Sequence, residues 1–224
     1  MKTKLLCVIC CVTLLACGKS EQGNPAPATI PSASRNVSAD TSHMAKSAPL
    51  KIRDLYIGMD IQGVPNAMMA ILAEQELSDF SFTDVIPVSD GTQCVLMYTK
   101  PFLRTIENRM HERYGEARAQ AKVDEEILTS CINSDGVMMV KSGADGKVSR
   151  IEFNDVKDIF NATDLAPADF VRKLSSEYHI PEMKPNEAQT SWSYTSPDGT
   201  SVVVDAKEVL GIPMMRLYMS KAAP

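Results

Sequence analysis

The segment Gln93-Cys94-Val95-Leu96-Met97-Tyr98-Thr99 decides the fold, because it is apolar on both of its alternating sides. In a β-strand, neighbouring side chains point to opposite faces of the sheet. One face would carry Cys94, Leu96 and Tyr98, and the other Val95 and Met97. A strand that is apolar on both faces needs cover on both sides, so we predict that 93–99 is a central strand.

Further strand candidates surround this segment, and turn residues separate them. We predict strands at 80–88, 126–132, 137–141, 147–153, 191–195, 201–209 and 213–219. Ser89-Asp90-Gly91, Asn133-Ser134-Asp135-Gly136, Ala144-Asp145-Gly146 and Pro197-Asp198-Gly199 are typical turn sequences. Short strands joined in this way indicate antiparallel meanders.

Three segments have the spacing of helices. They are 64–72 with Pro65 in its first turn, 102–121, and 163–178 with Pro167 at its start. Segment 102–121 has apolar residues every three or four positions and charges on its other side, which predicts an amphipathic helix docked on a core. Helices followed by runs of strands indicate an α+β fold, with helices packed on one face of an antiparallel sheet. Because this order occurs twice, two related helix-plus-hairpin units are one interpretation.

The N-terminus has the features of a secretion signal. Lys2 and Lys4 precede an apolar run, 5–15, of 11 residues, whereas a bilayer-spanning helix needs about 20. A positive start, a short apolar core and a small residue are typical of a signal peptide. An ordinary secreted protein, or a cytosolic protein with an apolar start, are the alternatives.

Leu14-Leu15-Ala16-Cys17 resembles the lipobox of bacterial lipoproteins. The resemblance implies that 1–16 is removed and that Cys17 carries diacylglycerol and a further acyl chain such as palmitate. Several acyl chains anchor a protein firmly in a bilayer. Gly18 resembles the residue found in lipoproteins passed to the outer membrane. We therefore expect a protein of the bacterial cell envelope, lipid-anchored in the outer membrane and facing the periplasm.

Composition divides the remaining chain into a tether and a folded part. Residues 17–49 contain several prolines among small polar residues and few large apolar ones, which predicts a flexible tether with a reach of roughly 30 Å. We expect one α+β unit at 50–155 and a second at 156–224, with a single continuous domain as the alternative. The whole chain has a net charge of −5, and removing 1–16, with its two lysines and no acids, leaves −7. Such an acidic chain is a poor candidate for binding nucleic acid.

Two cysteines remain once the signal is removed and Cys17 is lipidated. In an oxidising compartment, Cys94 and Cys131 are candidates for a disulfide. Closing that loop would stabilise the fold by roughly 3–4 kcal/mol in the loop-entropy model. Two buried free thiols are the alternative.

A second resemblance rests on Ile57-Gly58-Met59-Asp60 and the helix that follows. This start resembles the small outer-membrane lipoproteins of the SmpA/OmlA type, one of which belongs to the β-barrel assembly machinery. The Gly-Met pair and Val64 match their pattern, but the glycine-proline that follows in that family is missing. The resemblance implies scaffolding or binding without an active site.

The residues offer little for catalysis. His43, His111 and His179 share no ligand spacing, and no nucleophile motif occurs, so we predict neither a metal nor a cofactor. An enzyme would have to use scattered carboxylates such as Asp60, Asp84 and Glu152. Trp192 and Tyr194 alternate on one strand and are candidates for contact with a partner, although a sheet core also favours aromatic residues.

We therefore expect a non-catalytic, membrane-anchored lipoprotein that binds another envelope protein as an assembly factor, scaffold or inhibitor. An immunity lipoprotein that neutralises a periplasmic toxin is the second hypothesis, because a strongly basic toxin would be attracted to a chain of net charge −7. An enzyme with an unrecognised carboxylate site is the third.

Overall fold

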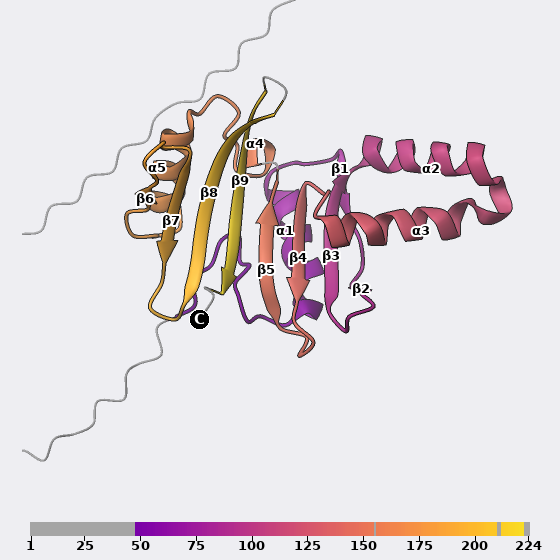
Figure 1. The fold of residues 1–224 in the computed structure, drawn as a ribbon, viewed down its shortest axis with the longest axis horizontal. Coiled ribbons are helices and arrows are strands. Elements are labelled where there is room, and N and C mark those ends of the chain that lie inside the picture. Colours follow the sequence, from indigo (N-terminus) through magenta and orange to yellow (C-terminus); the bar gives the residue numbers. More distant parts are fainter. Residues whose placement is uncertain (1–47, 155, 210–211, 222–224) are drawn as a thin grey trace, which may run out of the picture. The chain divides into compact units, whose positions relative to one another are not determined.

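The computed structural model describes residues 48–154, 156–209 and 212–221. The expected signal, Cys17, His43 and nearly all of the expected tether lie outside these residues. The described part contains one nine-stranded antiparallel sheet with helices, so the α+β class is confirmed (Figure 1). The strand order is β1-β3-β4-β5-β9-β8-β7-β6, and β2 also pairs with β3.

The elements have the following bounds. The strands are β1 (Phe80–Phe82), β2 (Ile86–Pro87), β3 (Gln93–Thr99), β4 (Met138–Ser142), β5 (Val148–Phe153), β6 (Lys184–Pro185), β7 (Ser191–Thr195), β8 (Thr200–Val209) and β9 (Ile212–Lys221). The helices are η1 (Ile61–Gly63, a 3-10 turn), α1 (Val64–Glu74), α2 (Lys100–Tyr114), α3 (Glu116–Asn133), α4 (Val156–Ile159) and α5 (Pro167–Glu177).

Strand β3 is buried on both faces, as its sequence predicts. It pairs with β4 on one side and with the short strands β1 and β2 on the other. Val95 and Met97 belong to the main core, and Cys94, Leu96 and Tyr98 belong to a second apolar cluster on the opposite face. The strand therefore joins two layers of helices through the sheet.

The main core lies between the sheet and helices α1, α4 and α5. Phe160 is at its centre, with its ring 5.1 Å from that of Phe153 and 5.7 Å from that of Phe170. Both contacts are edge-to-face, the geometry that aromatic pairs prefer. The Arg53 side chain closes this core from the N-terminal side. It donates to the Ile159 carbonyl at 3.1 Å and lies over the Phe160 ring at 5.5 Å.

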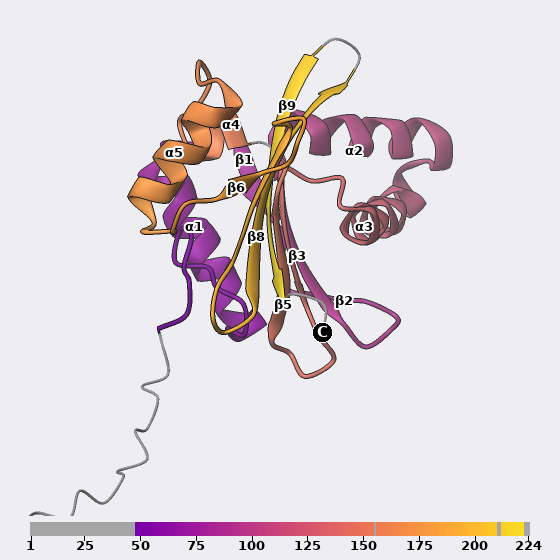
Figure 2. The same ribbon diagram turned by 60° about the vertical axis from the view of Figure 1, so that its left-hand side comes forward.

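The prediction that the helices pack on one face is wrong in this detail. Figure 2 shows α1, α4 and α5 on one side of the sheet and α2 and α3 on the other. Leu103 and Ile127 pack against the cluster under α3, which contains Cys131 and Met139. Helices are needed on both faces because β3 is apolar on both.

The predicted strand at 126–132 is also wrong, because these residues form the last turns of α3. Val123, Ile127 and Cys131 recur every four residues, which is helical spacing. The predicted helix 102–121 is instead two helices that meet at Gly115, where φ is +72°. Arg109 on α2 therefore pairs with Glu126 on α3, at 2.6 Å.

Smaller differences concern segment boundaries. The predicted strand 80–88 is broken into β1 and β2, and α4 was not predicted. Helix α5 begins at Pro167, the residue predicted for its first turn, but four residues after the start of the predicted range 163–178, and its N-cap residue Ala166 makes no side-chain cap hydrogen bond. Strand β5 of the first expected unit pairs with β9 of the second, so both ranges contribute to one continuous sheet.

Candidate partner-binding site

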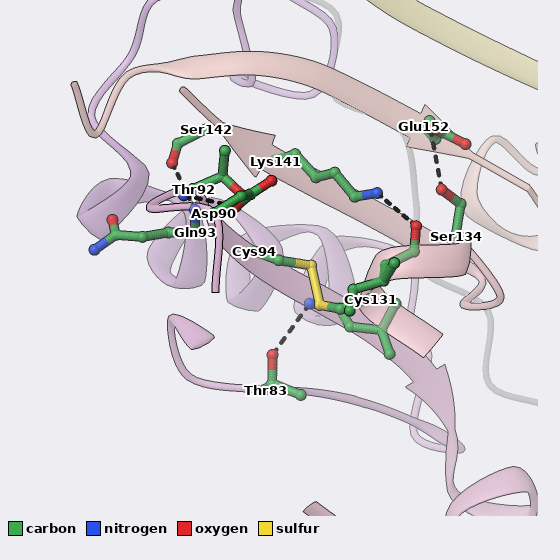
Figure 3. The surroundings of a disulfide bond; sticks show 12 residues. Thr83, Asp90, Thr92, Gln93, Cys94, Cys131, Ser134, Lys141, Ser142 and Glu152 are labelled. Atoms are coloured by element: carbon green, nitrogen blue, oxygen red, sulfur yellow. Dashed lines mark hydrogen bonds between the residues drawn. A yellow bond between two sulfur atoms is a disulfide. The ribbon is translucent and has the colours of Figure 1, made fainter. Parts of the chain in front are cut away.

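A disulfide joins the last turn of α3 to β3. Cys94 and Cys131 have an S–S distance of 1.98 Å and a Cα–Cα distance of 6.3 Å, and both residues are fully buried (Figure 3). The pairing predicted from the cysteine count is therefore present. Because the bond lies at the base of α3, it fixes where this helix leaves the sheet.

Helices α2 and α3 form an antiparallel arm that extends past β3 (Figure 1). The 15 residues of α2 correspond to a length of about 22 Å. The seam between the two helices is short, with Ile106, Met110, Ala119 and Val123 buried in it. Tyr114 at the tip is 37% exposed, with Arg113 and Lys122 over its ring. An arm with so little core of its own depends on its base for orientation.

Beyond β4, strands β5, β9 and β8 turn a largely polar surface toward the side of the arm. We call this surface the open face. The strand pairing places its side chains in rows across the sheet, with Glu152, Tyr218 and Val203 in one row and Arg216 and Asp205 in the next. Alternate residues of the same strands, such as Leu217 and Val204, point into the main core. The open face thus consists of Arg150, Glu152, Val203, Asp205, Arg216 and Tyr218, with Ser193, Ser201 and Ser220 around them.

A charged pair and an aromatic ring form the centre of the open face. Glu152 is 3% exposed, forms an ion pair with Arg150 and accepts a hydrogen bond from the Ser134 hydroxyl at 3.3 Å. The guanidinium of Arg150 also lies 5.9 Å from the centre of the Tyr218 ring. A β-bulge at Ser149 shifts the pairing of β4 with β5, and bulges re-aim neighbouring side chains. The Arg150 side chain remains 53% exposed despite these contacts.

The end of α3 stands next to the open face. Lys141 on β4 donates to the Ile132 carbonyl at 2.9 Å, and partial burial lowers the pKa of this lysine (Figure 3). The Asn154 amide donates to the carbonyls of Ser134 and Gly136, at 2.9 and 2.8 Å, and so holds the turn after the helix. Ile132 itself is 51% exposed. A rigid corner results, with an exposed isoleucine on one wall.

Two hollows lie on either side of this helix end. The first, of about 320 Å³, is lined by Ile132, Lys141 and Arg150 together with residues of the 88–92 turn. The second, of about 270 Å³, is lined by Asn154, Met214 and Arg216 together with the 134–137 turn. Each hollow therefore combines an arginine with an accessible apolar side chain.

No family model matches this sequence. Comparison with curated proteins and with solved structures also finds no match. The two family resemblances therefore stay predictions that rest on their own residues.

The aromatic residues proposed from the sequence lie in the core. Trp192 is 8% exposed and belongs to the main cluster, and Tyr194 packs against that cluster while partly exposed. These positions favour a role of both side chains in the core of the sheet over contact with a partner. Tyr218 and Arg150 on the open face were not singled out, although alternation along 213–219 places Tyr218 on the side opposite Leu217 and Met219.

The carboxylates considered for an enzyme do not share a site. Asp60 accepts from the Gln62 amide at 3.0 Å, which lowers its pKa, and pairs with Lys147 at 3.2 Å. Lys147 directly precedes β5, whereas Glu152 lies near the other end of that strand. Asp84 is exposed between β1 and β2. The three carboxylates are therefore distributed over the molecule.

The described residues contain no group of His, Cys, Asp and Glu that could hold a metal, and no helix among them is long and apolar enough to cross a bilayer. His111 lies on α2 with Nδ1 2.9 Å from the Glu107 carbonyl. His179 follows α5 with a positive φ of 53°. His111 is thus bonded within its own helix, and His179 lies in the turn that follows α5.

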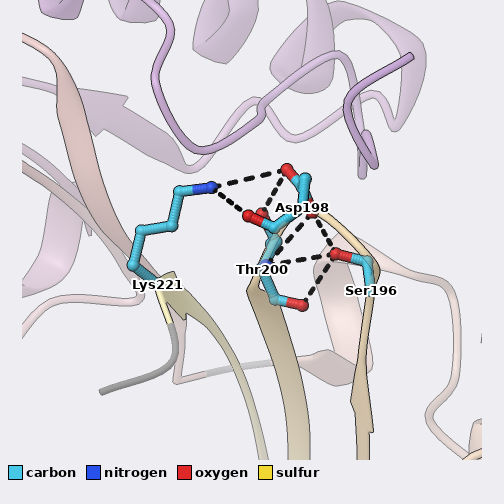
Figure 4. A network of polar contacts seen from close by, with 4 residues as sticks. All are labelled: Ser196, Asp198, Thr200 and Lys221. Carbon is cyan, nitrogen blue, oxygen red and sulfur yellow. Dashed lines mark hydrogen bonds and ion pairs between the residues drawn. The ribbon is translucent and has the colours of Figure 1, made fainter. Parts of the chain in front are cut away.

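A network of hydrogen bonds stabilises the turn of the β7–β8 hairpin. Asp198 accepts from the Ser196 hydroxyl, from the Thr200 amide at 3.1 Å and from the Thr200 hydroxyl at 3.0 Å (Figure 4). Lys221 adds an ion pair at 3.5 Å. The Ser196 hydrogen bond contributes most to lowering the pKa of Asp198, to about 2. All of these contacts stay within the hairpin and the end of β9, so the network stabilises the turn.

Proposed function

We propose that this protein is a non-catalytic lipoprotein of the bacterial cell envelope that binds another protein in the corner between the end of α3 and the open face. One observation carries the proposal. The open face displays Tyr218 with the Arg150 guanidinium 5.9 Å from its ring centre, near an exposed Ile132, and the described residues place no helix over it.

The residue types support protein binding. Tyr and Arg are enriched among the residues that contribute most to binding at protein interfaces, and such residues cluster in pockets from which the partner excludes water. Arg150 and Arg216 each line one of the two hollows that border this corner, and Tyr218 is on the same face of the sheet as both arginines. The disulfide and the Asn154 hydrogen bonds hold the corner in one conformation, which lowers the entropic cost of binding.

The envelope location is supported by the signal-like N-terminus and by the disulfide. Disulfides persist mainly in oxidising compartments such as the periplasm. Growth with a clickable palmitate analogue tests the anchor. The wild-type protein should incorporate label and sediment with outer membranes, and Cys17→Ser should abolish both. Unchanged labelling of Cys17→Ser would contradict lipidation at this position.

Photo-crosslinking in intact cells tests the binding corner. We would place benzoylphenylalanine at position 132, where Ile132 is 51% exposed beside the corner, and separately at position 69, where Met69 is 58% exposed on α1. Helix α1 covers the other face of the sheet, so position 69 is a control of similar exposure (Figure 2). A discrete adduct from position 132 alone supports the proposal. Adducts from position 69 alone, or from neither position, contradict it.

The identity of the adduct also distinguishes the hypotheses. An assembly or scaffolding role predicts an outer-membrane protein or another envelope component. An immunity role predicts a secreted toxin, and a strongly basic toxin fits poorly to a face that displays Arg150 and Arg216. We therefore favour an assembly or scaffolding role.

A further inference from the structure

The first of the two hollows beside the end of α3 contains charges of both signs. Its volume of about 320 Å³ is at the lower end of the range for small-molecule sites. Lys141 and Arg150 occupy opposite positions on β4 and β5, and Asp90 belongs to the turn that forms another wall. Arg150 is already paired with Glu152. Lys141 and Asp90 are therefore the charged groups in this hollow that could contact a ligand.

The Lys141 ammonium has unused hydrogen-bonding capacity. An ammonium group has three donors. Among the described residues, Lys141 donates to one acceptor, the Ile132 carbonyl at 2.9 Å, and it forms no ion pair with their carboxylates (Figure 3). Partial burial lowers the pKa of this lysine, because a charge removed from water is destabilised. The ammonium can therefore donate further hydrogen bonds to a bound carboxylate.

Asp90 supplies the complementary group. Its Oδ1 atom accepts from the Thr92 amide at 3.0 Å and from the Thr92 hydroxyl. These two hydrogen bonds, with a smaller contribution from the charge of Lys141, lower the pKa of Asp90. Its Oδ2 atom accepts no hydrogen bond from the described residues. The hollow thus contains an ammonium and a carboxylate that do not pair with each other.

We propose that this hollow binds a free α-amino acid with an apolar side chain. The ligand carboxylate accepts from the Lys141 ammonium, and the ligand ammonium donates to Oδ2 of Asp90. The apolar side chain packs on Ile132 and Val88, which also line the hollow. The inference does not depend on the proposed function, although the hollow borders the same corner.

The balance of charge favours a zwitterion over a simple anion or cation. The charged groups around the hollow are Lys141, Arg150, Asp90 and Glu152, two of each sign. An anion would be attracted to Lys141 but repelled by Asp90, and a cation would be attracted to Asp90 but repelled by Lys141. A zwitterion pairs with both groups and needs no excess of either charge. A peptide terminus carries one of the two charges, so it satisfies one group.

An NMR titration of the mature, full-length chain with leucine tests the proposal. N-acetyl-leucine lacks the ammonium and leucinamide lacks the carboxylate, so these two compounds are matched control ligands. Leucine should shift the amide signals of residues 89–92, 132 and 141 saturably, with a dissociation constant of about 1 mM. Each control ligand should bind at least about tenfold more weakly. The absence of a saturable shift with leucine would overturn the inference.

Variants test the two charged groups separately. Asp90→Asn keeps an oxygen that can accept from Thr92 but removes the charge, so it should preserve the turn and weaken leucine binding about tenfold. Lys141→Met removes the ammonium and should weaken binding to a similar extent. Asp145→Asn is the matched control and should leave the affinity unchanged, because Asp145 accepts from the Lys147 amide in a similar turn and does not line this hollow.

The remaining outcomes identify the error if the inference is wrong. Equal affinity for leucine and N-acetyl-leucine would indicate an anion site, and equal affinity for leucine and leucinamide a cation site. An unchanged affinity in Asp90→Asn would also overturn the inference, even if Lys141→Met does not fold. Glycine that binds as tightly as leucine would contradict the packing on Ile132. If the adduct from position 132 forms but leucine does not bind, the protein-binding function stands and this inference fails.

Discussion

The two faces of the sheet are built from the same strands but have opposite compositions. The face toward α1, α4 and α5 is continuous and apolar, with Phe153, Val204 and Leu217 fully buried. The other face is apolar only under α3 and becomes polar from β5 onward. Strands with one apolar and one polar face are usual in antiparallel sheets with one side exposed to water. The unusual feature is that one sheet combines both arrangements.

This difference assigns folding stability and partner binding to opposite faces of the sheet. Fully burying a large apolar side chain contributes about 1.5–3 kcal/mol, so the covered face supplies most of the folding free energy. The open face contributes less, because its charged side chains are partly solvated and exposed pairs are weak. Its residues can therefore be selected for a partner without loss of the fold.

The largest expected effect is at the covered face. Phe160→Ala should lower the free energy of unfolding by about 3–5 kcal/mol, because it removes the ring at the centre of the aromatic cluster and leaves a cavity. The measurement is equilibrium unfolding in urea, followed by circular dichroism.

Tyr218→Ala is the matched substitution on the open face. It removes a ring of similar size from a partly exposed position and should cost less than about 1.5 kcal/mol. Equal losses for the two variants would show that the open face is part of the folding core, and the contrast drawn between the faces would then be wrong.

The next effect concerns the base of the arm. Replacing both Cys94 and Cys131 by alanine should lower stability by about 3–4 kcal/mol in the loop-entropy model. Hydrogen exchange should show α2 and α3 losing more protection than α5, because the bond links the arm to the sheet. Uniform loss of protection across the molecule would mean that the disulfide stabilises the whole fold and not this side in particular.

A smaller effect is expected at the tip. Gly115 has φ +72° and ψ 165°, a backbone region that is open almost only to glycine. Gly115→Ala should therefore cost about 1–3 kcal/mol, although no atom lies within 4 Å of the added Cβ. The control is Gly63→Ala, where φ is −82°. If both variants unfold at the same denaturant concentration, an alanine at position 115 carries no extra backbone cost, and the turn between the two helices does not require glycine.

Strands and turns were largely predictable from local pattern. The bounds of β3 and β7 match the predicted segments, because apolar residues alternate between clear turn signals. Pro167 marked the start of α5 in the same way. The cysteine count alone led to the disulfide, once the N-terminal cysteines were assigned to the signal and the anchor.

The arm was not predictable because its two signals are weak. Gly115 is a lone glycine in a charged helical run, and only its positive φ reveals a turn. Ile127 and Leu128 near the start of a short segment suggested a strand, whereas the spacing of Val123, Ile127 and Cys131 indicates a helix. The open face was missed for another reason, since its rows combine β5, β9 and β8, and the pairing of β5 with β9 joins distant parts of the chain.

The smallest effect is expected at the β7–β8 turn, where Asp198 has a pKa of about 2 in the folded protein, chiefly through its hydrogen bond with Ser196. An unfolded aspartate titrates near 3.9. Because the folded pKa is the lower one, the ionised carboxylate stabilises the fold. This contribution is fully present above about pH 4 and is lost as the pH falls through about 2. The carboxylate is largely solvated, so we expect less than about 1 kcal/mol.

Asp198→Asn should therefore be slightly less stable than wild type at pH 6, and the difference should shrink between pH 4 and pH 2. Ser196→Ala keeps the carboxylate but removes its main hydrogen-bond donor, so the pKa of Asp198, measured by NMR, should rise toward 3.9. A difference between Asp198→Asn and wild type that does not change with pH would show that the side chain acts through turn geometry and not through its charge. The contribution of the turn to stability would then depend on packing and geometry, as on the covered face, and not on charge, as on the open face.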